Sequence, residues 1–235
     1  YVRDELEIYP GAPYGIGGIL VGSGAQASGV RQVLDRFLEA RIHTANTNFS
    51  GADTRSQAYQ QLQFALRELG DQDLSTSLNS FIQAVQNAAN QPDDPALRNI
   101  VVQQGQLFAQ DVVDLRTRVG ELRDSYSDQM RSLVLEANTL IEEISRLNPQ
   151  ISRLEANGLG LSEAGGLRVQ RLNAINRLSE IIPVRVHEHP SGAIDVYTDS
   201  DFLILGGYAQ KLETVLAPNA SGVAEATVRT TPSKL

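Results

Sequence analysis

Residues 115–154 decide the fold of this chain, and they read LRTRVGELRDSYSDQMRSLVLEANTLIEEISRLNPQISRL. Apolar side chains recur in this stretch at alternating steps of three and four residues, the heptad repeat of a helix that packs lengthwise against another helix. Two successive four-residue steps around Tyr126 to Met130 interrupt the repeat and locally relax the left-handed supercoil. The stripe consists of Leu115, Val119, Leu122, Tyr126, Met130, Leu133, Ala137, Leu140, Ile144, Leu147, Ile151 and Leu154.

The helical pattern that contains this stripe begins at Ala96 and continues for about fifty residues, which corresponds to roughly 75 Å of helix. A compact domain of this size does not need so long a helix. We therefore expect a rod that extends toward other subunits or assembles with them. We expect Pro149, with Asn148 as a possible cap, to kink the rod or to restart a short helix that Asn157 and Gly158 close. The residues that we expect to carry helix packing and assembly are Leu133, Leu140, Ile144, Leu147 and Ile151.

Three further helices flank the rod in the sequence. The first begins near Ser28, with Val33 on its apolar face, and is weakened by a polar middle before Gly70 stops it. The second spans 74–89 and ends before the Pro92–Pro95 turn. The last runs through 167–181, after a Gly-rich loop that includes Gly165 and Gly166, and is expected to fold back on the rod.

Short strands are predicted at both ends of the chain. Residues 1–29 alternate Gly and Pro with short apolar runs, which is typical of strands and turns. After Pro183 the apolar period changes to two, which predicts a hairpin around His189–Gly192 with Asp195 and Tyr197 on the face opposite Ile194 and Val196. Further strands are expected at 202–205 and 223–228. The fold class is therefore mainly α with a β-rich portion, divided into an entry segment (1–29), a long-helix rod domain (30–182) and a β-rich segment leading to an outer domain (183–235).

Composition excludes several classes of function. The 235 residues carry a net charge of −8 and no visible basic patch, which disfavours nucleic acids and anionic membranes as partners. The absence of cysteine excludes disulfides, thiolate nucleophiles and Cys-ligated zinc. No apolar run is long enough to cross a bilayer, and we expect no basic-then-apolar leader. Tyr1 stands where an initiator methionine would stand, so we expect a fragment or a processed chain.

Two motifs could in principle hold a ligand. Gly22–Ala27 follows an apolar triplet and resembles the first turn of a dinucleotide-binding unit, but no second strand with an acidic residue follows, so a turn leading into a helix is the favoured interpretation. His187 and His189 lie two apart in a predicted strand and could begin a metal site, with His43 the remaining histidine in a distant helix. A surface hairpin is the favoured interpretation, and we expect no metal and no cofactor.

Three acidic pairs have structural explanations. Asp93–Asp94 can cap the helix near Ala96, Glu142–Glu143 lies on the solvent side of the stripe, and Asp199 and Asp201 belong to a turn. The sequence also lacks the Gly-x-Ser-x-Gly elbow of many hydrolases. We therefore expect no catalysis.

The chain resembles the flagellar hook-associated protein 1 family, the first of the two proteins that join the bacterial flagellar hook to its filament. The segments that carry the resemblance are Tyr1–Arg3, Gly29–Arg31, Asp35–Leu38, Asp93–Arg98, Leu147–Leu154, Arg171–Leu178, and the hairpin with Tyr197 and Gly206–Gly207. They occur in the family's order over nearly the whole chain, and Pro149 stands where the family more usually has a polar residue.

The resemblance implies an extracellular structural subunit of the flagellum, exported without a cleaved signal peptide. In that family, terminal helices pair as coiled coils and middle β domains project outward, so the first helix would precede Tyr1 and the C-terminal helices would follow Leu235. The implied partners are the hook protein, the second hook–filament junction protein, copies of the chain itself in a ring, and an export chaperone for the full-length protein.

Two alternatives stay open at this point. One is another flagellar filament-type structural protein, such as the second junction protein or a flagellin. The other is a ligand-binding or enzymatic module that uses Gly22–Ala27 or the His187/His189 pair.

Overall fold

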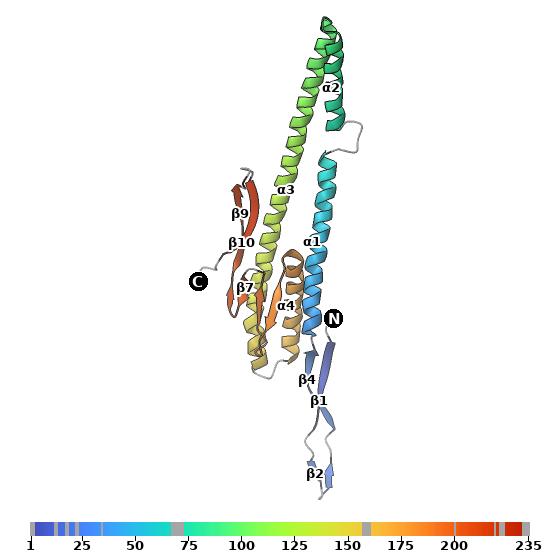
Figure 1. Ribbon diagram of the computed structural model, residues 1–235. Coiled ribbons are helices and arrows are strands. Elements are labelled where there is room, and N and C mark those ends of the chain that lie inside the picture. The colour runs from blue at the N-terminus through green and yellow to red at the C-terminus, as the bar shows by residue number, and fades with distance from the viewer. Residues whose placement is uncertain are drawn as a thin grey trace. The chain divides into compact units, whose positions relative to one another are not determined.

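The computed structural model describes residues 3–11, 14–16, 19–21, 24–33, 35–66, 73–156, 161–199, 201–218, 220 and 224–231. Figure 1 shows a mainly α chain with a β-rich portion, which confirms the predicted fold class. The helices are α1 (Arg36–Leu66), α2 (Leu74–Asn90), α3 (Pro95–Ala156) and α4 (Leu161–Ile181). The strands are β1 (Arg3–Pro10), β2 (Tyr14–Ile16), β3 (Ile19–Val21), β4 (Ala25–Val33), β5 (Arg185–Glu188), β6 (Ile194–Tyr197), β7 (Phe202–Leu205), β8 (Tyr208–Ala209), β9 (Lys211–Pro218) and β10 (Ala224–Thr231).

The chain divides into two compact units. Unit 1 consists of residues 1–51 and 132–235, and unit 2 consists of residues 52–131. Helices α1 and α3 each contribute one part to each unit. The division into three segments at residues 29 and 182 stays a prediction.

The predicted helix start near Ser28 is wrong, because β4 occupies that stretch and α1 begins at Arg36. β4 pairs antiparallel with β1, with a register shift between Glu7 and Ile8. Gly29 and the β-branched Val30 and Val33 have low helix propensity, so an available strand partner outweighs the apparent helical spacing. Asp35 then caps α1, since its Oδ1 accepts from the backbone N–H groups of Phe37 at 3.0 Å and Leu38 at 3.1 Å.

The turn between α2 and α3 forms as predicted. α2 ends at Asn90, and Asp94 Oδ1 accepts from the Ala96 N–H at 2.8 Å, which makes Asp94 the cap of α3. At the other end of α2, Asp73 Oδ1 accepts from the Thr76 N–H at 2.6 Å. One backbone N–H group at the start of each of these two helices is therefore satisfied by a local side chain.

Helix α3 comprises 62 residues and continues through Pro149, so the predicted restart at this proline is wrong. Asn148 does not cap a helix either, because its side chain is buried against β6. α4 begins at Leu161, so Gly165 and Gly166 belong to this helix and not to the predicted loop. The remaining residues of that loop, 157–160, lie outside the described part of the chain.

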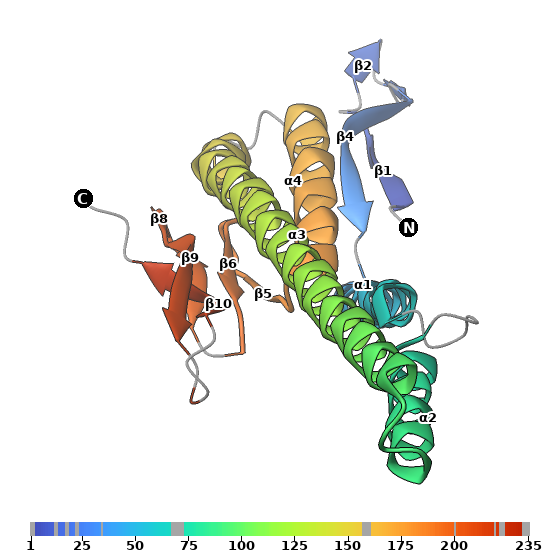
Figure 2. The same ribbon diagram turned by 90° about the horizontal axis from the view of Figure 1, so that it is seen from above.

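The core of unit 1 forms where α3, α4 and the four-stranded sheet β5–β6–β7–β8 meet, with α4 beside α3 in both views (Figures 1 and 2). This arrangement confirms the prediction that the last helix folds back on the rod. Each element contributes fully buried aliphatic side chains, which exclude water from the space between them. They include Ala137, Ile141 and Ile144 of α3, Leu178 of α4, Val196 of β6, and Leu203 and Ile204 of β7.

The C-terminal strands match the predicted hairpin and extend it. β5 and β6 pair antiparallel around residues 189–193, and β7 occupies the predicted 202–205. The prediction missed β9, which pairs with β10 along its whole length. Asp195 is buried together with Ile194 and Val196, because β6 is covered on both faces.

We expect Ile144→Asp to lower the free energy of unfolding by at least about 3 kcal/mol, since it removes a buried aliphatic side chain and inserts an unpaired charge. Ile144 is fully buried in the core of unit 1. The matched control is Leu135→Asp, which makes a comparable change at a position of the same helix where 68% of the side chain is exposed. Urea unfolding followed by circular dichroism measures both variants. Equal stability of the two variants would contradict the described core.

Candidate functional site

A polar face of α1 contacts α4 in unit 1. Glu39, His43, Asn46 and Thr47 follow the spacing of one helix face, and Asn46 Nδ2 donates to Ser179 Oγ at 3.1 Å. Thr47 Oγ1 donates to the Ser179 backbone carbonyl at 2.6 Å. The polar stretch that the sequence analysis interpreted as weakening this helix is therefore its contact face with α4, and the spacing of its residues was the available signal.

Glu39 and His43 are buried on this face, with 6% and 5% of their surfaces exposed. Glu39 Oε2 and His43 Nε2 are 3.9 Å apart, and neither atom has a hydrogen-bond partner. Burial lowers the pKa of His43 by more than the neighbouring Glu39 carboxylate and Asn176 side chain raise it. His43 lies in a helix, as predicted, and the structure shows that it is buried. Its unpaired polar neighbour was not predicted.

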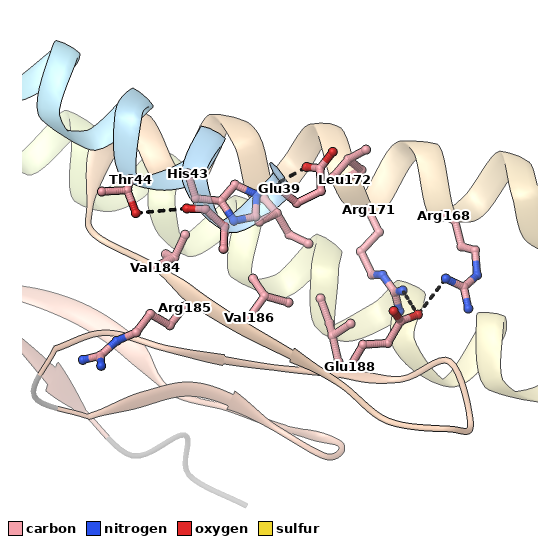
Figure 3. A pocket seen from close by; sticks show the side chains of 13 residues that line it. Glu39, His43, Thr44, Arg168, Arg171, Leu172, Val184, Arg185, Val186 and Glu188 are labelled. Carbon is pink, nitrogen blue, oxygen red and sulfur yellow. Dashed lines mark hydrogen bonds and ion pairs between the residues drawn. The ribbon is translucent and has the colours of Figure 1, made fainter. Parts of the chain in front are cut away.

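These two residues line a pocket of about 450 Å³ between α1, α4 and β5, which we call the α1–α4 pocket (Figure 3). Val184, Val186 and Glu188 of this strand segment point toward the helices, whereas Arg185 points away from them (Figure 3). This alternation follows from the period of two along an extended strand. One end of the pocket is apolar and polar groups close the other.

Two arginines of α4 lie at the polar end of the pocket and already have partners. Arg168 Nε donates to Glu155 Oε1 at 2.5 Å, and its Nη1 donates to Glu188 Oε1 at 2.7 Å. Arg171 Nη1 donates to the Gly192 carbonyl at 2.7 Å and to Asn148 Oδ1 at 3.0 Å. Burial, together with the charge of Arg168, lowers the pKa of Arg171 to about 10, which leaves it protonated at neutral pH.

Two asparagines of α3 hold the strands by bonding both backbone groups of one residue. Asn148 Nδ2 donates to the Ile194 carbonyl at 2.7 Å, and Asn148 Oδ1 accepts from the Ile194 N–H at 3.3 Å. Asn138 makes the same pair of bonds with Leu212, at 2.9 Å and 2.8 Å. Each asparagine therefore takes the place of a neighbouring strand residue, and neither role was predicted from the sequence.

The structure brings the predicted histidine pair together, and one of the two rings, that of His189, contacts the Asp195 carboxylate. The rings of His187 and His189 are 5.2 Å apart, and His189 Nε2 lies 2.7 Å from Asp195 Oδ2. Burial would raise the pKa of Asp195, but the hydrogen bond from the Gly206 N–H and the contact with His189 outweigh it and lower the pKa. His43 is on α1, on the polar face described above, and among the described residues no three His, Cys, Asp or Glu side chains form a group that could hold a metal ion.

The other candidate positions have ordinary surroundings where they are described. Strand β4 begins at Ala25, within the Gly22–Ala27 motif, where the sequence analysis expected a turn leading into a helix, and Gly22 and Ser23 lie outside the described residues. Glu142 is exposed and pairs with Lys211 at 2.6 Å, and Asp199 pairs with Arg185 at 2.9 Å. In the described part of the chain, none of the helices combines the length and apolarity that spanning a membrane requires.

The five predicted packing residues divide into two groups. Ile144, Leu147 and Ile151 are fully buried within this chain, and Leu140 packs against the core from its edge. Leu133 is 42% exposed. The prediction missed Val134 and Ile141, which are buried in the same helix because α4 and the sheet cover a wider face than a heptad stripe supplies. The role of the five residues in subunit assembly stays a prediction.

Unit 2 has almost no interior of its own. Among its described residues, 52–66 and 73–131, Ala84 is the one buried side chain. Gly105 lets Phe81 approach α3, since an added Cβ would meet the Phe81 ring at 3.2 Å, and Phe81 stacks on Phe108 with 6.3 Å between ring centroids. Large apolar side chains stay exposed on all three helical segments, namely Tyr59, Leu62, Phe64, Leu78, Ile82, Val85, Ile100, Val102, Leu107, Val112, Val113 and Val119.

Residues 59–234 match the family described as "Flagellar hook-associated protein FlgK helical domain". Among curated relatives, "Flagellar hook-associated protein 1" of Bacillus subtilis (strain 168) is 28% identical over 172 residues, which cover 73% of this chain and 33% of the relative. The protein of the same name from Salmonella typhimurium is 29% identical over 201 residues, covering 83% of this chain and 35% of the relative. The chain thus spans about a third of the length of the curated relatives it matches.

A solved structure has the same fold over most of the chain. It is described as "The structure of the flagellar hook junction protein FlgK from Burkholderia pseudomallei". The TM-score is 0.69 at 23% sequence identity, and the match covers 82% of this chain and 33% of that chain.

We expect Asn148→Leu to lower the free energy of unfolding by about 2–4 kcal/mol, because it leaves both backbone groups of Ile194 and one donor of the buried Arg171 without a partner. The matched control is Asn173→Leu, at an exposed position of α4. Urea unfolding monitored by circular dichroism gives both values. A loss no larger than that of the control would show that the asparagine bonds do not hold β6.

Lowering the pH should destabilise the fold through His43. Above the ordinary histidine pKa of 6.5, folded and unfolded chains both hold a neutral ring, and the stability contribution is complete. Below that pH, His43 of the unfolded chain binds a proton, whereas His43 of the folded chain stays neutral until the pH reaches its lowered pKa. The free energy of unfolding therefore falls as the pH decreases between these two pKa values. Urea unfolding between pH 7.5 and 5 should show a smaller decline for His43→Gln than for the wild type. Identical declines would contradict the buried, neutral state of His43.

Proposed function

Because the chain belongs to the family of the flagellar hook-associated protein FlgK helical domain, we propose that it forms part of a structural junction subunit that links the flagellar hook to the filament. It acts without catalysis and assembles by packing helices against neighbouring subunits. Load then passes through many small apolar contacts instead of a single site. The curated relatives carry the name of a hook-associated protein, and the solved structure is described as that of a hook junction protein, which supports this proposal.

The proposal includes partners and a location. The partners are the flagellar hook protein, the second hook–filament junction protein and copies of the chain in a ring, with an export chaperone for the full-length protein. The subunit is extracellular, reaches the flagellum without a cleaved signal peptide, and binds neither nucleic acid nor membrane. It needs no cofactor.

The exposed apolar surface of unit 2 is the observation that carries the proposal. A helical unit whose described residues bury one alanine side chain gains little stability from its own packing. Covering the exposed side chains with helices of another subunit supplies the missing burial, at about 25 cal/mol per Å² of apolar surface. Val102 and Val113 are 59% and 56% exposed and lie eleven residues apart on α3, three helical turns, so they share one outward face.

The proposal predicts that cells lacking this protein make hooks without filaments, visible by electron microscopy. Full-length protein should restore filaments, whereas the full-length variant Val102→Asp/Val113→Asp should not, because two charges then enter a helix contact. Both valines are exposed, so unchanged helix content and melting should accompany the defect.

The matched control for this experiment is Gln103→Asp/Gln110→Asp, which adds the same charges to exposed positions on another face of α3. This variant should restore filaments. Normal filaments in the deletion strain would refute the junction role, and full restoration by the valine variant would refute this face as a subunit contact.

A further inference from the structure

The α1–α4 pocket contains two buried polar atoms that lack partners. The side chains of Glu39 and His43 are 8% and 6% exposed, and both line the pocket. Glu39 Oε2 and His43 Nε2 make no hydrogen bond. A buried polar group left in this state costs about 1–3 kcal/mol, and more if it is charged, so a pair of such groups indicates a missing donor.

The geometry of the pair fits one donor group. The two atoms are 3.9 Å apart, which is less than twice the length of a charge-assisted hydrogen bond, so one nitrogen placed between them reaches both. A carboxylate oxygen accepts hydrogen bonds only, and a neutral imidazole nitrogen accepts when it carries no proton. The group that satisfies both at once is a donor, and the carboxylate favours a positively charged one.

The cations already present in the pocket do not fill this role. Arg168 is held by Glu155 and Glu188, and Arg171 is held by Asn148 and Gly192. The positive charges of these two arginines are therefore balanced or bonded at the far end of the pocket. The third lining arginine, Arg185, points away from the helices (Figure 3) and pairs with Asp199 at 2.9 Å. Glu39 has His43 as its one ion-pair partner among the described residues, at 3.9 Å.

The apolar end of the pocket fits an aliphatic stem. Ala40, Leu172, Ile175, Val184, Val186 and Ile194 form this lining. Val184 and Val186 point from the strand side toward the helices, opposite the wall that α1 contributes (Figure 3). Lysine and arginine side chains bury their methylene groups along apolar surface and keep the charged head on polar groups.

We propose that the α1–α4 pocket receives a lysine or arginine side chain of a partner polypeptide, whose cationic head bonds Glu39 Oε2 and His43 Nε2 and whose methylene stem packs on the aliphatic lining. The inference rests on the proposed function in one respect, since a subunit that assembles by side-chain packing meets such side chains at its contacts. Beyond the proposed function, the inference names the kind of partner side chain that this pocket binds.

Two other occupants fit the pocket less well. A divalent transition metal takes at least three protein ligands, and the described residues provide no group of three His, Cys, Asp or Glu around this pair. A water molecule could bridge the two atoms, but it would leave the aliphatic lining without contact and the carboxylate without a counter-charge. The experiment below distinguishes a pocket that binds a cationic side chain from one that holds water.

The first arm of the test uses n-butylammonium and n-butanol as probes on the 235-residue chain at neutral pH, with the methyl signals of Leu172, Ile175 and Val184 as NMR reporters. Butylammonium should bind saturably and about 10-fold more tightly than butanol. The reason is that a hydrogen bond to a charged group adds about this factor in affinity over a bond between neutral groups. Glu39→Gln should remove the difference, whereas Glu121→Gln, at an exposed position of α3, should preserve it. Equal binding of the two probes, or a preference that survives Glu39→Gln, would overturn the proposal in favour of a hydrated pocket.

The second arm tests whether the side chain of a polypeptide enters the pocket. Nα-acetyl-lysine N-methylamide should shift the same methyl signals, and the norleucine analogue, which lacks the ammonium group, should not. Binding of butylammonium without binding of the blocked lysine would restrict the pocket to free amines and overturn the assignment to a partner polypeptide. Thermal melting shows that each variant is folded. A failure in either arm leaves the filament experiment unaffected, so it is distinguishable from a failure of the junction role.

Discussion

The described architecture of unit 1 depends on a helix that bonds directly to the backbone of a sheet. Asn148 of α3 bonds both backbone groups of Ile194 and accepts from the buried Arg171, and Asn138 repeats the paired bonding at Leu212. A strand whose polar groups are matched by a helix side chain can lie against that helix without leaving a buried group unsatisfied. These hydrogen bonds fix the position of β6 against α3, and the aliphatic side chains of the core pack around it.

The two units use the same helices in different ways. In residues 132–156, α3 buries a continuous face against α4 and the sheet, whereas in residues 95–131 all of its side chains are at least partly exposed. Unit 1 can therefore be stable through its own packing, and unit 2 presents apolar side chains that another surface can cover. The division suits a subunit that carries its own folded body and contributes helices to a larger assembly.

The sequence predicted the elements whose signal is local. The heptad stripe gave α3, the proline turn gave the end of α2, and the change of period after Pro183 gave the β5–β6 hairpin. It did not predict β4, because that strand depends on pairing with β1, a long-range contact that no local spacing reports. The restart predicted at Pro149 does not occur, since a helix anchored by the buried Leu147 and Ile151 on either side of the proline tolerates one missing hydrogen bond.

Little of the candidate site could be read in the sequence. In the sequence His43 is a lone histidine, and its pairing with Glu39 follows only from the four-residue spacing that puts both on one face of α1. The tertiary fold brings together Arg171, Asn148 and Glu188, because α4 folds back on α3 and β5 covers both helices. Their spacing in the sequence therefore does not predict that they lie close together. The burial of Asp195 could not be predicted, because alternation assigns a face to a residue without saying whether that face is covered.

This chain has an interior of its own in unit 1 and almost none in the described residues of unit 2. Amide hydrogen exchange along α3 tests this claim most directly, because exchange reports local opening residue by residue. The amides of Val134–Ile151 should exchange at least about 100-fold more slowly than those of Ile100–Val119 in the isolated chain. Equal protection along the whole helix would contradict the account, since it would show that residues 95–131 are stabilised without any partner to cover them.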